Sequence, residues 1–504
     1  MLRRITFSWM TTLLALVVVQ CGEDDPTPSA LDSSPLPPMD QGAVQWLDPE
    51  NQSTWSKTEK PYFLFLFDRR SYWSREMARD AFGSPENANE ISRLTRPVWI
   101  DADLRPDLVD RYALGALPSL AVLTPDLEWI TGSTYLGAED MASLLRRIRI
   151  LVDVPERAED LERERAKLRM RRPHATTAFA NRLALGELRL RLTDAILKAP
   201  AWLQPGEGVI ALIETGNSDK ARAWAEANLR PERFHGSGAL YDATLTDDHR
   251  LTEERVSLAV NAGALYTVAT LASLTDDRFL AEQSRKLAEA FELSFGTSTS
   301  ELFGSGTADF SADTSGVIRP GAGAPSLYNR RSVTSWNALA VSAFCRTATL
   351  SAENPWPDRA RSILDAILKR RVKGSRVRRT EVASSVLQFE DAAHTIRACL
   401  DLADLTGETS YKSRASELAD RMLKDMLLEE GAVSHLIGAD GHYGSGAGVF
   451  AQCLVRMAKL NGTYLKDAER LCRLAIAHGA ERPSRLGAVV RALVMLEAKG
   501  TDLE

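Results

Sequence analysis

An unbroken run of apolar residues, Tyr62–Phe67, leads into the turn Ser71-Tyr72-Trp73-Ser74 and then into a stretch whose apolar residues recur at helical spacing. The run predicts a strand that is buried on both faces, and the periodic stretch predicts an amphipathic helix. A turn of this kind places its side chains at a helix N-terminus, where a cysteine would become a reactive thiolate. Serines stand there instead, and a hydroxyl cannot form a disulfide. The turn therefore predicts a structural role, with one serine hydroxyl capping the helix.

Residues 43–151 continue with elements that extend this unit into a complete α/β domain. A second apolar strand ends at Asp101, and a short helix opens near Pro106. Pro118 directly precedes an apolar strand, and a last amphipathic helix covers about residues 138–150. This order of elements is that of a thioredoxin fold, in which a proline in this position is cis beside the active turn. We therefore expect a cis bond at Pro118.

Residues 177–504 are almost entirely helical in pattern, with short polar joints between the helices. The joint Thr406-Gly407-Glu408 resembles a later one, Asn461-Gly462-Thr463, in its polar residues and central glycine. We expect eleven or twelve helices arranged as repeated hairpins, which close into an (α/α)6 toroid when each hairpin gives one inner and one outer helix. Residues 152–176 alternate Glu and Arg and predict a charged helical linker, with an anionic lipid head group as an alternative partner. The basic run at 369–379 predicts a solvated loop.

Both domains resemble the spermatogenesis-associated protein 20 family. The matching motifs in the first domain include Arg105-Pro106-Asp107 and Leu123-Thr124-Pro125-Asp126, and those in the second are Thr334-Ser335-Trp336-Asn337 and Glu390-Asp391. The family motif Cys-His-Trp-Cys-His corresponds to Ser71-Tyr72-Trp73-Ser74-Arg75 here, so Ser71 and Ser74 mark lost redox positions. The resemblance implies a thioredoxin-like domain followed by an all-α (α/α)6 toroid of the type found in six-hairpin glycosidases and N-acylglucosamine 2-epimerases.

Such toroids are similar to sugar-acting enzymes whose sites lie in the central cavity. Glu390 and Asp391 open a predicted helix, where the helix dipole favours carboxylates, and they are the candidate acid/base pair. Trp336 offers a face for a sugar ring, and Asn337 offers an amide. The alternative is that the acids cap their helix and that Trp336 fills the core. Tyr72 and Trp73 form a second candidate binding surface, on the retained turn.

The spacing of the histidines does not match the pattern of a metal site. His394 lies one turn after Asp391 and is either a base or a histidine of a helix face. His435, Asp440 and His442 match no metal-ligand pattern and are expected in a loop. No Gly-rich phosphate loop is present in the sequence, so we expect neither a metal nor a cofactor. The toroid also departs from the family at residues 258–262, where an aspartate is missing, and this favours reduced catalysis.

The N-terminus predicts export. Met1-Leu2-Arg3-Arg4 and the apolar run after it indicate a signal peptide over 1–21, and Cys21 resembles the acylated cysteine of a bacterial lipoprotein. Residues 22–42 would then be a disordered tether on a periplasmic or cell-surface protein anchored in the membrane. The net charge of -6 argues against a nucleic-acid partner.

The other cysteines, Cys345, Cys399, Cys453 and Cys472, lie in apolar helical stretches and are expected as buried free thiols, with a disulfide as the alternative.

Two functions are compatible with these patterns. The first is an exported, non-redox protein in which both domains form a binding or scaffold module for a glycan or another small molecule. The second is a carbohydrate-active enzyme, epimerase-like or hydrolase-like, with Glu390 and Asp391 in the toroid cavity.

The missing sulfur atoms lead to a direct test. We expect the purified protein to reduce insulin disulfides no faster than buffer, because no thiolate can form at Ser71 or Ser74. The measurement is insulin turbidity in the presence of dithiothreitol, with a thioredoxin as the positive control. Catalysis above the buffer rate would overturn the non-redox assignment.

Overall fold

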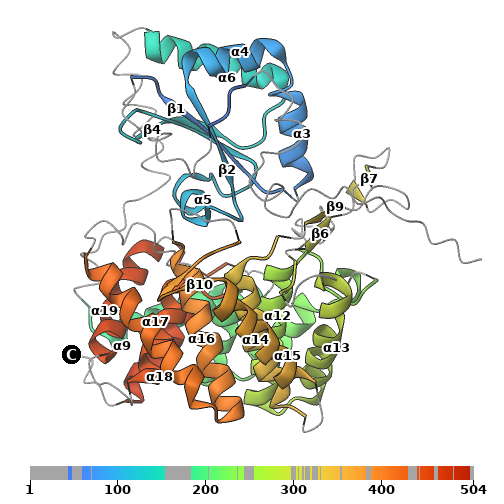
Figure 1. Ribbon diagram of the computed structural model, residues 1–504, viewed down its shortest axis with the longest axis vertical. Helices are drawn as coiled ribbons and strands as arrows, with labels where there is room; N and C mark the ends of the chain where they lie inside the picture. Colours follow the sequence, from blue (N-terminus) through green and yellow to red (C-terminus); the bar gives the residue numbers. More distant parts are fainter. Residues whose placement is uncertain are drawn as a thin grey trace, which may run out of the picture.

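The computed structural model shows a small α/β domain standing over one end of a ring of helices (Figure 1). The structure describes residues 44–47, 59–69, 71–153, 183–201, 204–234, 236–242, 255–296, 302–304, 306–308, 311–312, 318–319, 327–329, 331–351, 355–381, 387–428, 440–441, 443–458, 464–480 and 482–499. The predicted signal peptide with Cys21, the tether, His435, His442 and almost all of the charged connector lie outside these ranges.

The α/β domain is built on a four-stranded sheet in the order β2-β1-β3-β4. The central strand β1 (Tyr62–Phe67) pairs in parallel with β2 (Arg96–Asp101) and antiparallel with β3 (Ser119–Leu123), and β3 pairs antiparallel with β4 (Trp129–Ser133). This is the topology of a thioredoxin fold, as the sequence predicts. The Leu117–Pro118 bond is cis, which confirms the expectation for Pro118.

Strand β1 separates two apolar cores because its side chains alternate between the faces of the sheet. Phe63, Phe65 and Phe67 contact one core, which also contains residues of the helices α3 (Tyr72–Asp80), α4 (Pro85–Leu94) and α6 (Ala138–Asp153). Tyr62, Leu64 and Leu66 contact the other core, beneath α5 (Pro106–Tyr112). Helix α5 lies on the side of the sheet that faces the ring (Figure 1).

The second domain is an (α/α)6 toroid, in agreement with the sequence. Within the described residues, twelve helices alternate between an outer and an inner layer. The inner helices are α10 (Gly206–Glu214), α12 (Leu258–Thr275), α14 (Thr334–Ala348), α16 (Phe389–Thr406), α18 (Gly446–Met457) and α20 (Gly487–Glu497). The outer helices are α9 (Leu185–Lys198), α11 (Lys220–Asn228), α13 (Arg278–Phe295), α15 (Trp356–Arg370), α17 (Thr409–Leu428) and α19 (Tyr464–Gly479).

The inner layer is a closed ring, because each inner helix packs against the next and α20 packs against α10. The closure requires glycine: a Cβ on Gly487 would lie 2.3 Å from the backbone nitrogen of Gly208. Helix α12 is long and apolar enough to span a membrane by length and composition, but 72% of that window is buried in the protein. Its apolar character is therefore that of a core helix.

Short strands precede three of the inner helices, α12, α14 and α16. One small sheet joins β5 (Arg255–Ser257), β6 (Gly306–Ala308) and β9 (Leu327–Asn329). Between α15 and α16, β10 (Val372–Lys373) and β11 (Arg376–Val377) form a hairpin. This hairpin corrects the expectation of a solvated loop at 369–379, because Arg371 and Arg379 in that run are both buried.

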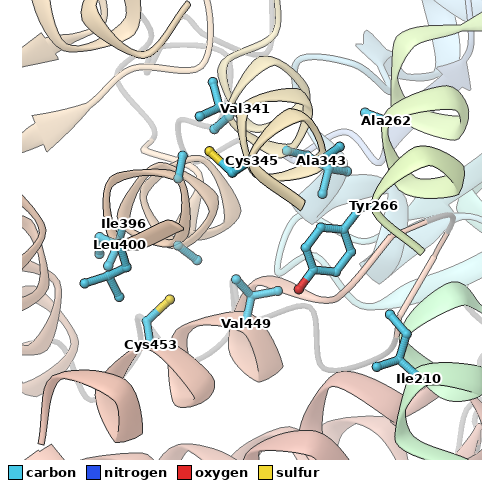
Figure 2. Packing of buried hydrophobic residues seen from close by; sticks show 14 of the residues in the cluster. Ile210, Ala262, Tyr266, Val341, Ala343, Cys345, Ile396, Leu400, Val449 and Cys453 are labelled. Carbon is cyan, nitrogen blue, oxygen red and sulfur yellow. The ribbon is translucent and has the colours of Figure 1, made fainter. Parts of the chain in front are cut away.

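Within the described residues, four cysteines are buried in the helical domain as free thiols, as the sequence predicts. Figure 2 shows Cys345 and Cys453 among apolar side chains such as Val341, Leu400 and Val449. Burial raises the pKa of Cys399 and of Cys472 to about 12, and that of Cys453 to about 11. These thiols are therefore protonated and shielded at neutral pH.

The burial of these thiols predicts their reactivity. In a Cys21→Ser background, we expect native protein to react with Ellman's reagent at least roughly a hundredfold more slowly than a free thiol, because the thiolate is the reactive form. Unfolding in concentrated urea should then release all four thiols. Rapid labelling of the native protein would contradict the packing of Cys345, Cys399, Cys453 and Cys472.

Candidate functional site

All six inner helices begin at the end of the toroid that faces the α/β domain, here called the mouth. Helix N-termini carry partial positive charge and unpaired N–H groups, so carboxylates are stabilised there. Asp440 accepts hydrogen bonds from the N–H groups of Ser445 and Ala488, at 2.8 and 2.9 Å, and so joins the first turns of α18 and α20. Burial and the neighbouring Glu207 raise the pKa of Asp440 to about 7.

Glu390 and Asp391 lie at the start of α16 and share one cation. Nη1 of Arg379 is 2.6 Å from Oε1 of Glu390 and 3.3 Å from Oδ2 of Asp391. Asp391 is fully buried and also accepts a hydrogen bond from the N–H of Ser335, in the first turn of α14. Burial, and also Glu390, raise the pKa of Asp391 against the opposing effect of Arg379. The pair is thus part of a hydrogen-bonded cluster around one cation, and this cluster joins two helix ends.

Trp336 and Tyr443 complete this cluster. The indole N–H of Trp336, a residue that is 5% exposed, donates to the Tyr443 hydroxyl at 2.9 Å. That hydroxyl is 3.4 Å from Oε1 of Glu390, to which it donates. Tyr443 itself is half-buried, so it is the member of the cluster with the most access to solvent. Tyr443 has no sequence motif of its own, so no pattern in the sequence marks it as part of this cluster.

His394 lies behind Tyr443, with the two rings edge to face at 5.3 Å. Its Nε2 is 3.1 Å from the carbonyl oxygen of Gly444, and its buried Nδ1 has no hydrogen-bond partner. Burial, and then Arg397, lower the pKa of His394 to about 4. The imidazole is therefore neutral near pH 7, with Nε2–H as the donor and Nδ1 as an acceptor.

Asn337 has a structural function in this arrangement. Its Oδ1 accepts from the N–H of Phe303, and its Nδ2 donates to the carbonyl oxygens of Phe303 and Val333. Asn261 makes the equivalent bonds to Leu240 and Ser257 at the same position of α12. The recurring asparagine therefore fastens the chain segment that precedes an inner helix.

The α/β domain contacts the mouth through buried ionic and polar groups. Asp101, at the end of β2, pairs with Arg69 of its own domain and with Arg331 of the toroid, at 2.6 and 2.9 Å. Burial would raise the pKa of Asp101, but Arg331 and Arg69 hold it far below its usual range. Nε of Arg379 donates to the carbonyl oxygen of Asp103. Arg379 therefore connects the α/β domain with the acids of the toroid.

A second polar contact lies beside this one. Gln388, the residue before α16, donates to Oδ1 of Asp107 at 3.0 Å. Asp107 also accepts from Arg105 at 2.8 Å. The Arg105-Pro106-Asp107 motif thus forms part of the domain interface.

The interior of the ring contains a second ion cluster, which the sequence analysis missed. Glu207 on α10 pairs with Arg397 on α16 at 2.9 Å, and with Arg491 on α20 at 2.7 Å. Helices α10 and α16 are opposite each other in the ring of six, so this pair crosses its centre. Burial acts against ionisation, yet Arg397 and Arg491 lower the pKa of Glu207 to about 2. Charged side chains therefore fill the ring at this depth.

The turn of the α/β domain keeps its shape without sulfur. The hydroxyl of Ser71 caps α3 by accepting from the N–H of Ser74, and the hydroxyl of Ser74 accepts from the N–H of Asp68. Both serines are buried. Trp73 is 44% exposed and contacts the ring of Tyr135 edge to face, at 5.1 Å. The side chain of Tyr72 lies outside the described residues.

Within the part of the chain that the structure describes, no group of three His, Cys, Asp or Glu residues could hold a metal ion. Asp440 caps helices, as described above, and its two predicted loop neighbours His435 and His442 lie outside the described ranges.

The chain is similar to known proteins in its fold. No family model and no curated protein matches the chain. Among solved structures, it is similar to a GH76 α-mannanase from Bacteroides thetaiotaomicron, with a TM-score of 0.41 and 12% identity over 61% of this chain and 85% of that one. It is also similar to a cellobiose 2-epimerase from Bacillus thermoamylovorans, with a TM-score of 0.38 and 12% identity over 53% and 73% of the two chains. A likeness this distant assigns no activity.

Arg379, Glu390, Asp391, Trp336 and Tyr443 are here called the mouth cluster. The cation that Glu390 and Asp391 share leads to a stability test. Arg379→Met would leave Glu390 and Asp391 buried without their partner, which should lower the free energy of unfolding by about 3–5 kcal/mol. The loss should shrink as the pH falls, because the carboxylates can then fold in the protonated form.

Urea unfolding measures this effect. Arg376→Met, an exposed position of the same hairpin, is the matched control and should change stability by no more than about 0.5 kcal/mol. Equal effects of the two substitutions would contradict the assigned role of Arg379.

Proposed function

We propose that this chain is a non-redox binding protein, in which the α/β domain covers the mouth of a helical toroid and the ligand is a glycan or a similar polyhydroxylated molecule. One observation carries the choice of binding over catalysis: Arg379 engages both Glu390 and Asp391. Oε1 of Glu390 and both oxygens of Asp391 lie within 3.4 Å of this permanent cation, which favours the ionised form and so disfavours these oxygens as a general base.

The absence of redox activity is supported by geometry. Ser71 caps α3, and the hydroxyl of Ser74 accepts a hydrogen bond from the N–H of Asp68, so both hydroxyls serve the local structure. The four cysteines in the described residues are buried, and the pKa of each is raised by burial. None of these groups presents a thiolate to a substrate disulfide.

The ligand class is supported by the half-buried edge of the mouth cluster. Tyr443 brings a ring face and a hydroxyl, and its neighbours Trp336 and Glu390 bring a second ring and a carboxylate. Aromatic faces with a few fixed polar groups are the usual lining of small-molecule sites. The ion pairs across the ring centre would restrict a ligand to the mouth.

A second candidate function is a carbohydrate-active enzyme at the same place, with Glu390 and Asp391 as acid and base. It is favoured by His394, which is neutral, buried and has an acceptor nitrogen without a partner, and by the raised pKa of Asp391. Perturbed groups of this kind gather at active sites, although structural ion networks perturb pKa values as well.

The cellular setting is part of the proposal. Export, with attachment to the membrane through a lipid on Cys21, is supported by the signal-like N-terminus alone. Membership of the spermatogenesis-associated protein 20 family is supported by the quoted motifs and by the succession of a thioredoxin-type domain and a toroid.

The binding proposal is tested by thermal unfolding with a panel of mono- and oligosaccharides. We expect at least one sugar to raise the unfolding midpoint by about 2 °C or more at saturation. Tyr443→Phe, which keeps the ring and removes the hydroxyl, should weaken the binding of that sugar by about tenfold. Tyr411→Phe, whose hydroxyl bonds to Asp365 at 2.8 Å, is the matched control and should bind normally.

Two results separate the alternatives. If no sugar shifts the midpoint, or if both tyrosine variants lose binding equally, the proposed site is wrong. If the bound sugar is converted, and Glu390→Gln stops conversion while binding persists, the protein is an enzyme.

A further inference from the structure

A cavity at the rim of the toroid has a chemical character different from that of the mouth cluster. It lies between the end of α9 and the short 3-10 helix η6 (Pro483–Arg485), which precedes α20. Its volume is about 380 Å³, and its lining includes Lys198, Ser484 and Arg485 beside alanine and proline side chains. This volume is within the range of about 300–1,000 Å³ that is usual for small-molecule sites.

The cavity has an excess of positive charge. Within the part of the chain that the structure describes, neither Arg485 nor the adjacent Arg482 has an acidic partner that pairs with its side chain. Burial and the charge of Arg482 lower the pKa of Arg485, and the buried Asp440 opposes them only in part. Lys198 pairs with Asp194 at 2.6 Å, but both side chains are more than half exposed. An exposed pair of this kind is weak, so a bound anion could replace Asp194.

Both walls of the cavity are fixed to the fold. The amide of Gln204 donates to the carbonyl oxygens of Ile196 and Ala199, and so closes the end of α9. On the other side, the carbonyl oxygen of Arg485 accepts from the N–H of Asp440. The carbonyl oxygens of Ile196 and Ala199 are therefore already hydrogen-bonded. The cavity is a preformed recess, since neither wall has to be rebuilt around a ligand.

We infer that this recess binds an anionic phosphate ester, with its phosphate group held between Arg485 and Lys198 and its polar body beside Ser484. A guanidinium group binds two phosphate oxygens at once, and the ammonium group of lysine adds a point charge. The volume exceeds what a phosphate group alone would fill, which leaves room for a small alcohol or sugar. Two sources present this chemistry: a soluble sugar or glycerol phosphate, and the head group of an anionic phospholipid.

The test is calorimetric titration of the folded protein with glucose 6-phosphate and with glycerol 3-phosphate, at constant ionic strength. We expect saturable binding of one equivalent, with unphosphorylated glucose as the comparison. Arg485→Gln should weaken binding of the phosphate ester by at least tenfold. Lys198→Met, on the opposite wall, should weaken binding by a smaller factor. Arg376→Gln removes an exposed arginine elsewhere and should leave binding unchanged.

A second arm identifies the source of the phosphate. Vesicles of phosphatidylglycerol in phosphatidylcholine are sedimented with the protein, and pure phosphatidylcholine is the control. Retention that depends on Arg485 assigns the recess to a lipid head group, whereas binding of the soluble esters alone assigns it to a metabolite. The inference is overturned if neither probe binds saturably, or if Arg376→Gln weakens binding as much as Arg485→Gln does.

Discussion

Six inner helices run in the same direction, and this single constraint organises the molecule. It places six helix N-termini, with their partial positive charge, at one end of the ring. Asp391 and Asp440 lie there and bond to the N–H groups of neighbouring helices. The α/β domain also turns an acidic segment toward this end, and Arg331 and Arg379 mediate its contact. The domain interface and the candidate site are thus two parts of one electrostatic arrangement.

The same arrangement explains why acids at the mouth are an ambiguous sign of catalysis. A carboxylate beside a helix N-terminus is stable without any reaction to perform. Deeper in the ring, Glu207 is held by Arg397 and Arg491, which come from two other helices. Buried ion pairs of this type add little net stability compared with apolar packing, but they are costly to break singly. Loss of either arginine would therefore leave the buried Glu207 with an incomplete set of partners.

Much of the fold could be predicted from local patterns, because the apolar run Tyr62–Phe67 and the helical periodicity depend on residues that are close in sequence. The cis bond at Pro118 also followed from its place before a strand. The partners of Glu390 could not be predicted. Arg379 lies in a basic run that is typical of a solvated loop, but it is buried between the α/β domain and the start of α16. Tyr443 and Trp336 are 107 positions apart, a separation that no local pattern links.

Closure of the ring by α20 affects how the chain folds while it is being synthesised on a ribosome. The ring cannot close until Gly487 reaches Gly208, so α10 cannot complete its packing until nearly the whole chain has been synthesised. Until then Glu207 lacks Arg491, and an apolar helix such as α12 stays incompletely covered. Contacts between residues so distant in sequence form slowly, and the exposed intermediates aggregate easily. A nascent chain of this design therefore exposes apolar helix faces for longer than its compact final state suggests.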